Sequence, residues 1–403
     1  MHIELEKAQK LLLDHVNPLS AAIQPLSYCW GRVLAEDVIS AIDFPPFDRS
    51  PLDGYAVCSN DVIHAAHDTP ISLKVIDNIP AGSVGSQTVV PGTAARIMTG
   101  APLPPGASGV VRFEDTKSTD TAVQIFAGAD SAKNICKQGE EISIGQAVLK
   151  HGTVLNAGCM GLLAMLGKAA PLIYQKPTVG ILSTGSELVG LNQQLTSGKI
   201  RDTNSFMLLA QIQEAGGAAV LLGNVHDDTE SIVERLMSSP ECDIYITTGG
   251  ASVGDYDLMG NVLTALGITP LFHRIAIKPG MPVLAGFWKN SLLVGLSGNP
   301  AAASVSFEML VRPVLRKLAG YTDCWRPKAT AVLQGDFTKK SVSRRFVWAT
   351  CFSKGDTLYV TPASYQGNGM LKSMASANAL IDIPANSPPL SAGSQVEILM
   401  LNK

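Results

Sequence analysis

The alternation of strand-like and helix-like segments between residues 178 and 318 constrains the fold of this chain most strongly. Apolar runs begin at Thr178, Ala218 and Asp243, and each ends in glycine, threonine or acidic residues. Helical patterns follow them, and a long helix is predicted from Pro300 to about Leu318. Strands that alternate with helices in this way form an open, mostly parallel sheet with helices on both faces.

One stretch of this region, DIYITTGGASVGDYD at residues 243–257, combines a short buried strand with a glycine-rich loop. Gly249 and Gly250 allow the backbone to approach a ligand closely, and Ser252 adds a hydroxyl group. Asp255 and Asp257 would repel a bare phosphate, which favours a cation between the acids and an anionic ligand. A plain strand-to-helix turn with an aspartate cap is the alternative interpretation.

Further acidic and basic residues follow the other predicted strands. Glu187, Asp227 and Asp257 each stand just after a strand, and the segment IAIKPGMP contributes Lys278, with Arg274 four residues earlier. The carboxyl ends of parallel strands form one ligand-binding edge, so we expect a phosphorylated ligand held there through Mg²⁺ and lysine. Neither a GxxxxGK[ST] loop nor a GxGxxG motif occurs in the sequence.

The rest of the chain predicts three further domains. An amphipathic helix at residues 3–16 and an apolar, buried helix at residues 154–168 belong to an N-terminal linking domain at 1–43 and 141–172. Short strands interrupted by glycine and proline predict a small β domain at 44–140, inserted near the N-terminus. The α/β domain occupies 173–322, and renewed strand patterns predict a C-terminal β-barrel at 323–403.

Three local signals refine these elements. Asn204 is a candidate N-cap for the helix that ends at Gly216-Gly217, and Asp227-Asp228 opens the next helix. Residues 271–277 and 291–296 are expected to be two more strands. Pro313 is expected to kink the long helix that starts at Pro300.

The small β domain carries two polar turns of its own. The loop FDRSPLDGYAV contains Asp53 directly before a turn glycine, together with other charged residues that a turn does not need. Thr99 lies in a tight turn at a strand end, where its hydroxyl could bind an oxyanion. A charged hairpin turn and a threonine that bonds its own backbone are the alternatives.

The composition excludes several classes of protein. The formal net charge is −3 without a basic block, so nucleic acid is not an expected partner. No segment offers the roughly 20 uncharged apolar residues of a membrane span, and the N-terminus lacks the apolar run of a signal peptide. The seven cysteines are scattered, without a CxxC pair. We therefore expect buried free thiols in a reducing cytoplasm, and no membrane association.

The motifs together resemble the molybdopterin molybdenumtransferases, the family that includes the C-terminal domain of gephyrin. The matching segments occur in the family's order between residue 45 and about residue 320. They are PPFDRSPLDGYAV (45–57), RIMTGAPLP (96–104), GILSTGSEL (180–188), RDTNS (201–205), TTGGASVGDYD (247–257), IAIKPGMP (275–282) and GLSGNPAAA (295–303). The N-terminal helix and the C-terminal barrel fit the same plan.

This resemblance implies an enzyme of molybdenum cofactor biosynthesis. Such an enzyme takes adenylylated molybdopterin and molybdate, uses Mg²⁺, releases AMP and leaves molybdenum on the dithiolene sulfurs. The resemblance also implies a homodimer whose active site lies between the α/β domain of one subunit and the small β domain of the other. The molybdopterin adenylyltransferase and acceptor molybdoenzymes are further candidate partners.

The same resemblance assigns roles to individual residues. Asp53 and Thr99 match functional positions of the small domain, and Lys278 matches the lysine of the α/β domain. The acids expected to hold Mg²⁺ or polar groups of the substrate are Glu187, Asp227 and Asp257. The substrate- and phosphate-binding set is Arg274, Gly249, Gly250, Ser252, Ser297, Gly298, Asn299 and Pro300, with backbone N–H groups of the helix after Pro300 offered to an anion.

Four positions depart from the family's pattern. Ser297 stands where proline is frequent, Met281 where a second lysine is frequent, and Cys136 where an arginine is common. Arg274 stands where a lysine is common and retains the positive charge. Because two cations are missing, a non-catalytic molybdopterin-binding carrier or scaffold stays open as an alternative, as does a paralogue that inserts tungstate. Molybdate and tungstate are not distinguished by anything in this sequence.

Overall fold

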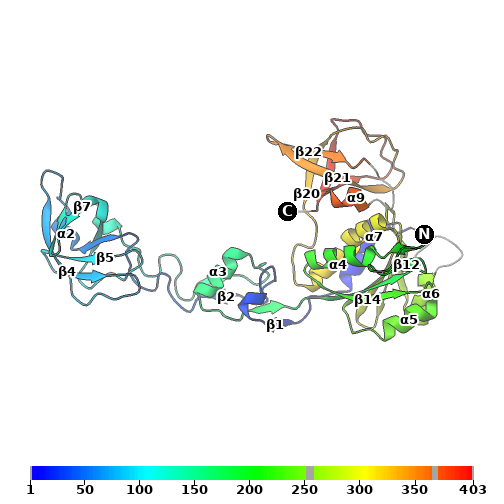
Figure 1. The fold of residues 1–403 in the computed structure, drawn as a ribbon, viewed down its shortest axis with the longest axis horizontal. Coiled ribbons are helices and arrows are strands. Elements are labelled where there is room, and N and C mark those ends of the chain that lie inside the picture. The colour runs from blue at the N-terminus through cyan, green and yellow to red at the C-terminus, as the bar shows by residue number, and fades with distance from the viewer. Residues whose placement is uncertain (1, 251–257, 365–370, 402–403) are drawn as a thin grey trace. The chain divides into compact units, whose positions relative to one another are not determined.

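The computed structural model describes residues 2–250, 258–364 and 371–401. The chain divides into two compact units, each of which is described by itself below. The larger unit contains residues 1–35, 152–157 and 170–403, and the smaller unit contains residues 36–151 and 158–169. Figure 1 shows the elements of both units along the chain.

The larger unit is built on a six-stranded sheet in the order β14-β11-β15-β19-β18-β16. Its strands are β11 (Thr178–Thr184), β14 (Ala218–Val225), β15 (Ile244–Thr248), β16 (Pro270–Arg274), β18 (Pro282–Trp288) and β19 (Ser291–Leu296). The pairs among β14, β11, β15 and β19 are parallel, and β18 is antiparallel to both of its neighbours. The open, mostly parallel sheet is thus confirmed. The strand β18, which the sequence analysis did not identify, adds an antiparallel hairpin with β19 at one side.

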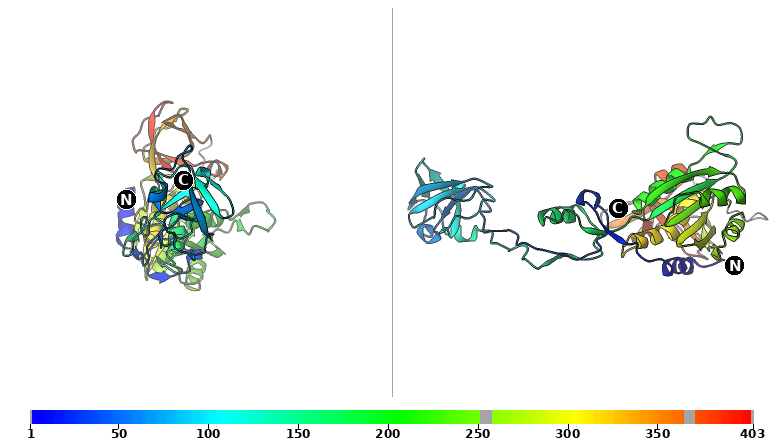
Figure 2. Two further views of the ribbon diagram at one scale, coloured as in Figure 1. Left: turned by 90° about the vertical axis from the view of Figure 1, so that its left-hand side faces the viewer. Right: turned by 90° about the horizontal axis from the view of Figure 1, so that it is seen from below.

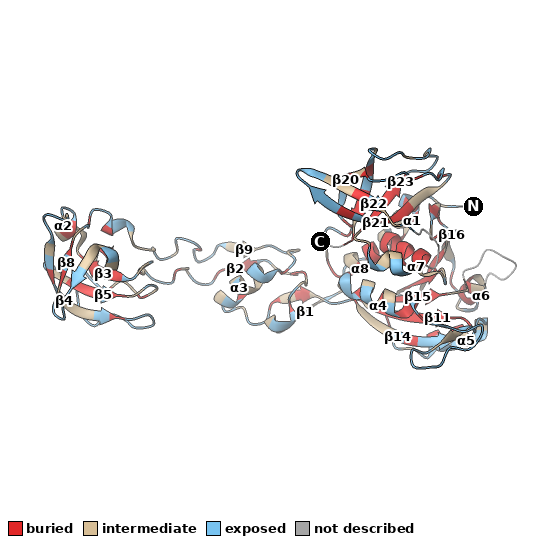
Figure 3. Ribbon diagram, turned by 45° about the horizontal axis from the view of Figure 1, so that its top comes forward, coloured by how far each residue is buried: buried red, intermediate tan, exposed pale blue. Residues whose placement is uncertain are grey.

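Helices cover both faces of this sheet because both faces are apolar. Ile181, Ile246 and Val294 pack on the face covered by α1 (Leu5–Asp14), α4 (Asn204–Glu214) and α7 (Pro300–Ser306). Tyr245 and Leu293 pack on the opposite face, under α5 (Thr229–Met237) and α6 (Leu258–Ala265). Strands that are buried on both faces read as continuous apolar runs, as these do. Figure 3 shows β11 and β15 as buried, whereas the edge strand β14 is mostly half-buried or exposed.

The predicted cap of α4 is wrong in one detail. Asn204 is the first helical residue, and its side chain makes no cap hydrogen bond. Asp202 takes that role instead, because its Oδ1 accepts a hydrogen bond of 3.1 Å from the backbone N–H of Ser205. At α5 the prediction is confirmed: Asp228 is the N-cap, and its side chain accepts from the N–H of Ser231 at 2.7 Å.

The helix that starts at Pro300 is continuous but irregular. It runs through α7, a π-helical segment at Phe307–Val311, and α8 (Arg312–Leu318). Pro313 lies within the first turn of α8, directly after the π-helical segment. Proline offers no N–H to the backbone oxygen of Met309 four residues earlier, and this oxygen accepts a hydrogen bond of 2.9 Å from Nε2 of Gln9. The expected kink stays a prediction.

The C-terminal region of the same unit forms a closed barrel. Its strands are β20 (Lys328–Leu333), β21 (Arg344–Lys354), β22 (Thr357–Pro362), β23 (Ala379–Ile383) and β24 (Gln395–Met400). They pair in the order β21-β22-β20-β24-β23, and β23 pairs back with β21. The short strand β17 (Ile277–Lys278) adds to the outside of β21 in a parallel register. The barrel predicted from the sequence is thus confirmed.

The smaller unit contains a second six-stranded sheet, in the order β6-β3-β5-β4-β8-β7. Its strands are β3 (Gly54–Val57), β4 (Ile71–Ile79), β5 (Thr93–Ile97), β6 (Gly109–Arg112), β7 (Thr116–Ser118) and β8 (Ala122–Ile125). Two apolar clusters form its core, one on each face. Residues 44–140, where the sequence predicts a β domain, contain only short helices besides these strands, in agreement with the prediction.

Short two-stranded sheets lie outside these cores. They are β1 (Ala21–Ile23) with β10 (Leu172–Tyr174), β2 (Val38–Ile39) with β9 (Ala147–Leu149), and β12 (Leu188–Val189) with β13 (Ile200–Arg201). Nothing in the structure tests the four predicted domain boundaries, which stay predictions.

One predicted helix differs from its expectation. The segment expected to be buried over 154–168 forms α3 (Ala157–Met165), and only Leu163 of this helix is buried. Apolar residues occur all around α3, and such a composition predicts a helix that is buried on every side. In the structure, contacts with other described residues bury only the side that carries Leu163. Among the described helices, none combines the length and the apolar character that crossing a bilayer requires.

Candidate functional site

The candidate site of the larger unit lies at the edge of the sheet where β11, β15 and β19 end. These strands run in parallel, so Thr184, Thr248 and Leu296 end side by side. Helix α4 follows β11 on one face of the sheet, whereas α6 follows β15 on the other. Neighbouring strands whose connections leave on opposite faces leave a crevice at their carboxyl ends, and ligands of open α/β sheets bind there.

Gly249 brings the loop after β15 into close contact with the end of β11. Its φ is +103°, and a Cβ atom on this residue would lie 2.4 Å from the backbone oxygen of Thr184. Gly298, in the loop after β19, also lies beside Gly249. A residue with a side chain is excluded from position 249 by both its conformation and its contacts.

A chain of buried hydroxyl groups connects the ends of two strands to the start of α4. The Oγ of Ser183 lies 2.9 Å from the Oγ of Ser205 and 3.2 Å from the Oγ1 of Thr248. All three residues are buried, and the backbone N–H of Ser205 is held by Asp202. The network fixes the amino end of α4 against β11 and β15. The sequence analysis missed it because these are ordinary strand and helix residues until the fold brings them together.

Three buried oxygen atoms at this edge have no hydrogen-bond partner among the described residues: Thr184 Oγ1, Asn204 Oδ1 and Asn299 Oδ1. The amide of Asn204 is oriented by its Nδ2, which donates to the backbone oxygen of Gly298 at 2.9 Å. Buried polar atoms are nearly always paired, so unpaired oxygens at a strand edge point to a group that supplies N–H donors or a cation.

The structure describes two of the three predicted acids. Glu187 and Asp227 are both exposed, after β11 and β14 respectively. Glu187 begins a long loop that contains β12 and β13 and projects from the sheet, drawn in green in Figure 2. Asp257 and Ser252 lie outside the described residues. Within the described part of the chain, no three His, Cys, Asp or Glu side chains gather in a metal-binding group.

The predicted cations lie at the same edge, beside the barrel. Arg274 ends β16, whose direction is that of β19, and it is exposed. Lys278 in β17 is the register partner of Arg345 in β21. Arg345 donates to the Oγ of Ser341 at 3.1 Å and lies over the ring of Phe337, and no carboxylate among the described residues pairs with it. The sequence analysis missed Arg345, although the double arginine in SVSRRF was a visible signal.

The loop SGNP begins α7 at this edge. The Oγ of Ser297 accepts a hydrogen bond of 3.2 Å from the N–H of Asn299, which is the N-cap residue of α7. Pro300 occupies the first turn, where its missing N–H costs no hydrogen bond. The hydroxyl group of Ser297 therefore helps to shape this loop. Proline, which is more frequent at this position in the family, has no hydroxyl group and could not accept this hydrogen bond.

In the smaller unit, the structure brings Asp53 and Thr99 together. Oδ1 of Asp53 accepts hydrogen bonds from the backbone N–H of Thr99 at 2.7 Å and from its Oγ1 at 2.8 Å. These two hydrogen bonds lower the pKa of Asp53. The residue after Asp53 has to be glycine, since a Cβ atom on Gly54 would lie 2.0 Å from the backbone oxygen of Val111. Asp53 is thus an exposed, ionised carboxylate held in one orientation.

Cys136 lies beside this polar loop. Its backbone forms two hydrogen bonds of 3.0 Å with Arg49, and its thiol pKa is raised by burial and by the neighbouring Glu140. Asp48 accepts hydrogen bonds from Lys137 Nζ at 2.8 Å and from the N–H of Gln138 at 2.9 Å, and these lower its pKa. The smaller unit therefore retains cations at Arg49 and Lys137 around the cysteine that departs from the family pattern.

The fold defines a class of protein: a multidomain α/β protein with a candidate ligand site at the carboxyl edge of a mostly parallel sheet, an additional β unit and a C-terminal barrel. Three family models match successive parts of the chain. They are "MoeA N-terminal region (domain I and II)" at residues 3–167, "Probable molybdopterin binding domain" at 180–317 and "MoeA C-terminal region (domain IV)" at 330–401.

Curated relatives agree over the full length. The molybdopterin molybdenumtransferase of Staphylococcus epidermidis is 35% identical over 396 residues, which are 98% of this chain and 94% of that protein. The enzyme of the same name from Staphylococcus aureus is 35% identical over 401 residues, 99% of this chain and 95% of its own length. The chain belongs to the molybdopterin molybdenumtransferase family, whose members are transferases of molybdenum cofactor biosynthesis.

A solved structure supports the same assignment. The molybdopterin biosynthesis moeA protein from Pyrococcus horikoshii OT3 is 32% identical, with a TM-score of 0.82, and the alignment covers 99% of this chain and 100% of that protein. The resemblance stated from the sequence motifs is thereby confirmed, as is the predicted fold class.

Proposed function

We propose that this protein transfers molybdenum from molybdate to adenylylated molybdopterin, with Mg²⁺, and releases AMP. The observation that carries the proposal is the set of unpaired oxygens of Thr184, Asn204 and Asn299 at the carboxyl edge of the sheet. A pterin presents N–H groups that match these acceptors, and the amino end of α7 faces the same edge. Family membership supports molybdopterin and molybdate as the substrates.

The oxygen donors at this edge suit Mg²⁺, which prefers carboxylate and amide oxygens. Glu187 and Asp227 would hold the ion, with Asp257 as a third ligand from the loop after β15. When bound, Mg²⁺ neutralises phosphate charge and polarises the phosphoanhydride bond that yields AMP. Gly249, Gly250 and Gly298 would let the loops approach the substrate closely, and Ser252 would contribute a hydroxyl group.

Arg274, Lys278 and Arg345 are proposed to bind the anionic groups, molybdate above all. Lys278 and Arg345 are register partners in neighbouring strands. Such strands lie about 4.8 Å apart, and two like charges directly opposite each other repel. An anion between the two side chains would remove this repulsion. With Arg345 present, the loss of a lysine at Met281 need not abolish anion binding.

We further propose a homodimer in which Asp53 and Thr99 of one subunit complete the site of the other. The segment at the start of the larger unit exposes large apolar side chains, with Ile23 69%, Tyr28 70% and Trp30 72% exposed. Patches of exposed aromatic residues are typical of protein interfaces. The proposed location is the cytoplasm, where the free thiols stay reduced. Candidate partners there are the adenylyltransferase that supplies the substrate and the acceptor molybdoenzymes.

The decisive experiment follows AMP release from adenylylated molybdopterin with Mg²⁺, with and without molybdate. Molybdate-dependent AMP release supports the transferase. Tight binding of the substrate without AMP release supports the carrier or scaffold, and would direct attention to Cys136 and Met281. Replacement of molybdate by tungstate in the same assay tests the third hypothesis, since equal or faster release with tungstate would favour it.

A further inference from the structure

A cavity of the larger unit, with a volume of about 360 Å³, shares no lining residue with the transferase site proposed above. It lies between α4, the helix that begins at Pro300, and the barrel with its helix α9 (Leu371–Ala375). Its apolar walls include Met207, Ala210, Trp348, Met374 and Ala375. Apolar cavities of roughly 300–1,000 Å³ with a few polar groups are typical of small-molecule sites.

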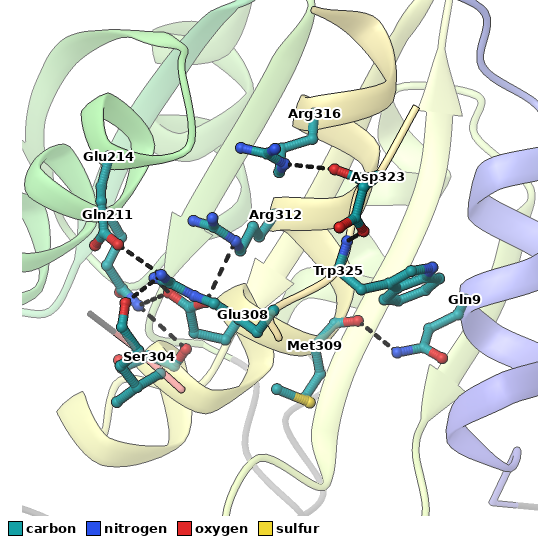
Figure 4. Close-up of polar contacts among 12 residues, drawn as sticks. Gln9, Gln211, Glu214, Ser304, Glu308, Met309, Arg312, Arg316, Asp323 and Trp325 are labelled. Atoms are coloured by element: carbon teal, nitrogen blue, oxygen red, sulfur yellow. Dashed lines mark hydrogen bonds and ion pairs between the residues drawn. The ribbon is translucent and has the colours of Figure 1, made fainter. Parts of the chain in front are cut away.

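The polar floor of this cavity is electrically balanced. Glu308 and Arg326, only 4% and 9% exposed, form hydrogen bonds of 2.8 and 3.1 Å. Arg326 also pairs with Glu214 at 2.6 Å, and Arg312 lies 3.8 Å from Glu308. Figure 4 shows Glu214 on α4, and Glu308 and Arg312 on the helix after β19, converging on this cluster. Two carboxylates and Arg326 line the cavity, and Arg312, which is not a lining residue, supplies the second guanidinium group, so the formal charges of the cluster cancel.

Gln211, which lines the cavity, has a buried polar atom without a partner among the described residues, as do Nε and Nη1 of Arg312, which is not a lining residue. Nε2 of Gln211 donates to Oε1 of Glu308 at 2.9 Å, which fixes the orientation of the amide (Figure 4). The opposite atom, Oε1 of Gln211, is buried and accepts no hydrogen bond from the described residues. Gln211 lines the cavity. An N–H or O–H group of a bound molecule is thus the donor that this oxygen lacks.

We propose that this cavity binds a small, neutral, amphipathic molecule with an aromatic or aliphatic body and one hydrogen-bond donor. The apolar walls would cover the body, and the two methionines would adapt to its shape. The donor would bond to Gln211. This site is separate from the transferase site, so its existence does not depend on the proposed function.

The test uses the full-length protein and two matched pairs of probes, indole with 1-methylindole and 2-naphthol with 2-methoxynaphthalene. Each second member lacks the donor but has more apolar surface, so hydrophobic burial alone predicts that it binds more tightly. We expect the reverse in ligand-observed NMR titrations. The donor-bearing member should bind about three- to tenfold more tightly, as one hydrogen bond contributes.

Two cavity variants, Ala210→Trp and Ala375→Trp, should each weaken indole binding at least tenfold, because both replace exposed lining residues by a side chain that fills the space. Ala265→Trp, an exposed alanine on α6, is the matched control and should bind like the wild type. The proposal is overturned if no probe binds, if the methylated probes bind as well as their partners, or if both cavity variants bind indole normally. Unchanged melting temperatures show that the variants fold.

Discussion

At the scale of single residues, Thr99 holds the exposed carboxylate of Asp53 in one orientation. Both hydrogen bonds reach the same oxygen, Oδ1, so Oδ2 receives none from Thr99. Because the pKa of Asp53 is lowered, these two hydrogen bonds stabilise the folded state at pH values above the ordinary aspartate pKa. This contribution is lost as the pH falls through the lowered value.

Thr99→Val should raise the pKa of Asp53 towards its ordinary value of about 3.9, because the variant retains the backbone donor but loses the hydroxyl donor. An NMR titration of the Asp53 carboxyl group measures this shift. AMP release should fall at least tenfold with an unchanged melting temperature. An unaltered rate would show that the hydroxyl of Thr99 takes no part in the reaction. Thr116→Val, in the same unit, is the control.

Gly249→Ala should destabilise the loop after β15 and abolish AMP release. The added Cβ would meet the Thr184 oxygen at 2.4 Å in a conformation that alanine rarely adopts. Loss of a few kcal/mol in chemical denaturation is expected. Gly267→Ala is the control, since it also has a positive φ but no atom within 4 Å. If both variants lose equal stability, the close approach at Gly249 has no special role.

At the scale of elements, hydroxyl groups and ion pairs fix the helices that carry the site. Ser183, Ser205 and Thr248 join two strands to α4, and the Glu308–Arg326 pair joins the π-helical segment to the barrel. Burial opposes the charge of Arg326, but its bonds to Glu308 and Glu214 outweigh burial and raise its pKa. Such buried groups specify how elements dock more than they stabilise them.

Ser205→Ala should cost about 1–3 kcal/mol of unfolding free energy, since it leaves Ser183 with fewer partners in a buried position. Because Asn204 is adjacent, the KM for adenylylated molybdopterin should rise more than kcat falls. Urea denaturation and steady-state kinetics measure both effects. Ser231→Ala on α5, outside this network, is the matched control. An equal rise of KM in both variants would contradict the positioning role.

Arg326→Met should destabilise the protein by about 3–5 kcal/mol, because buried Glu308 loses the cation that hydrogen-bonds to it and keeps only Arg312 at 3.8 Å. The double variant Arg326→Met with Glu308→Gln should recover part of that loss, since the buried carboxylate charge is then absent while the charge of Arg312 remains. The denaturation midpoints of the single and the double variant measure this difference in stability. If the double variant is no more stable than the single one, the cost arises from packing and not from the unpaired charge.

At the scale of the whole molecule, the proposed homodimer makes a sharp prediction by complementation. Asp53→Ala and Glu187→Ala should each be inactive alone. Mixing them under conditions that exchange subunits should restore about a quarter of the wild-type activity, because half of the dimers are mixed and hold one intact site. No recovery, with subunit exchange verified by mass spectrometry, would show that both residues act within one subunit.

Much of this molecule was predictable from sequence patterns. Apolar runs punctuated by glycine located β11, β15 and β19, because strands buried on both faces leave a continuous apolar signature. Turn glycines marked the loops at the strand ends, and the order of motifs identified the family. The barrel followed from alternating strands after Tyr321. These signals depend on neighbouring residues in the chain, so the sequence alone contains them.

The tertiary structure alone decided which side chains meet. Arg345 becomes a neighbour of Lys278 only through the parallel pairing of β17 with β21, and Ser183 reaches Ser205 only when α4 packs on the sheet. The exposed surface of α3 and the donor-free oxygen of Gln211 also depend on contacts between distant segments. Sequence patterns record the intrinsic preference of each segment, whereas burial and hydrogen bonding depend on partners that only folding brings close.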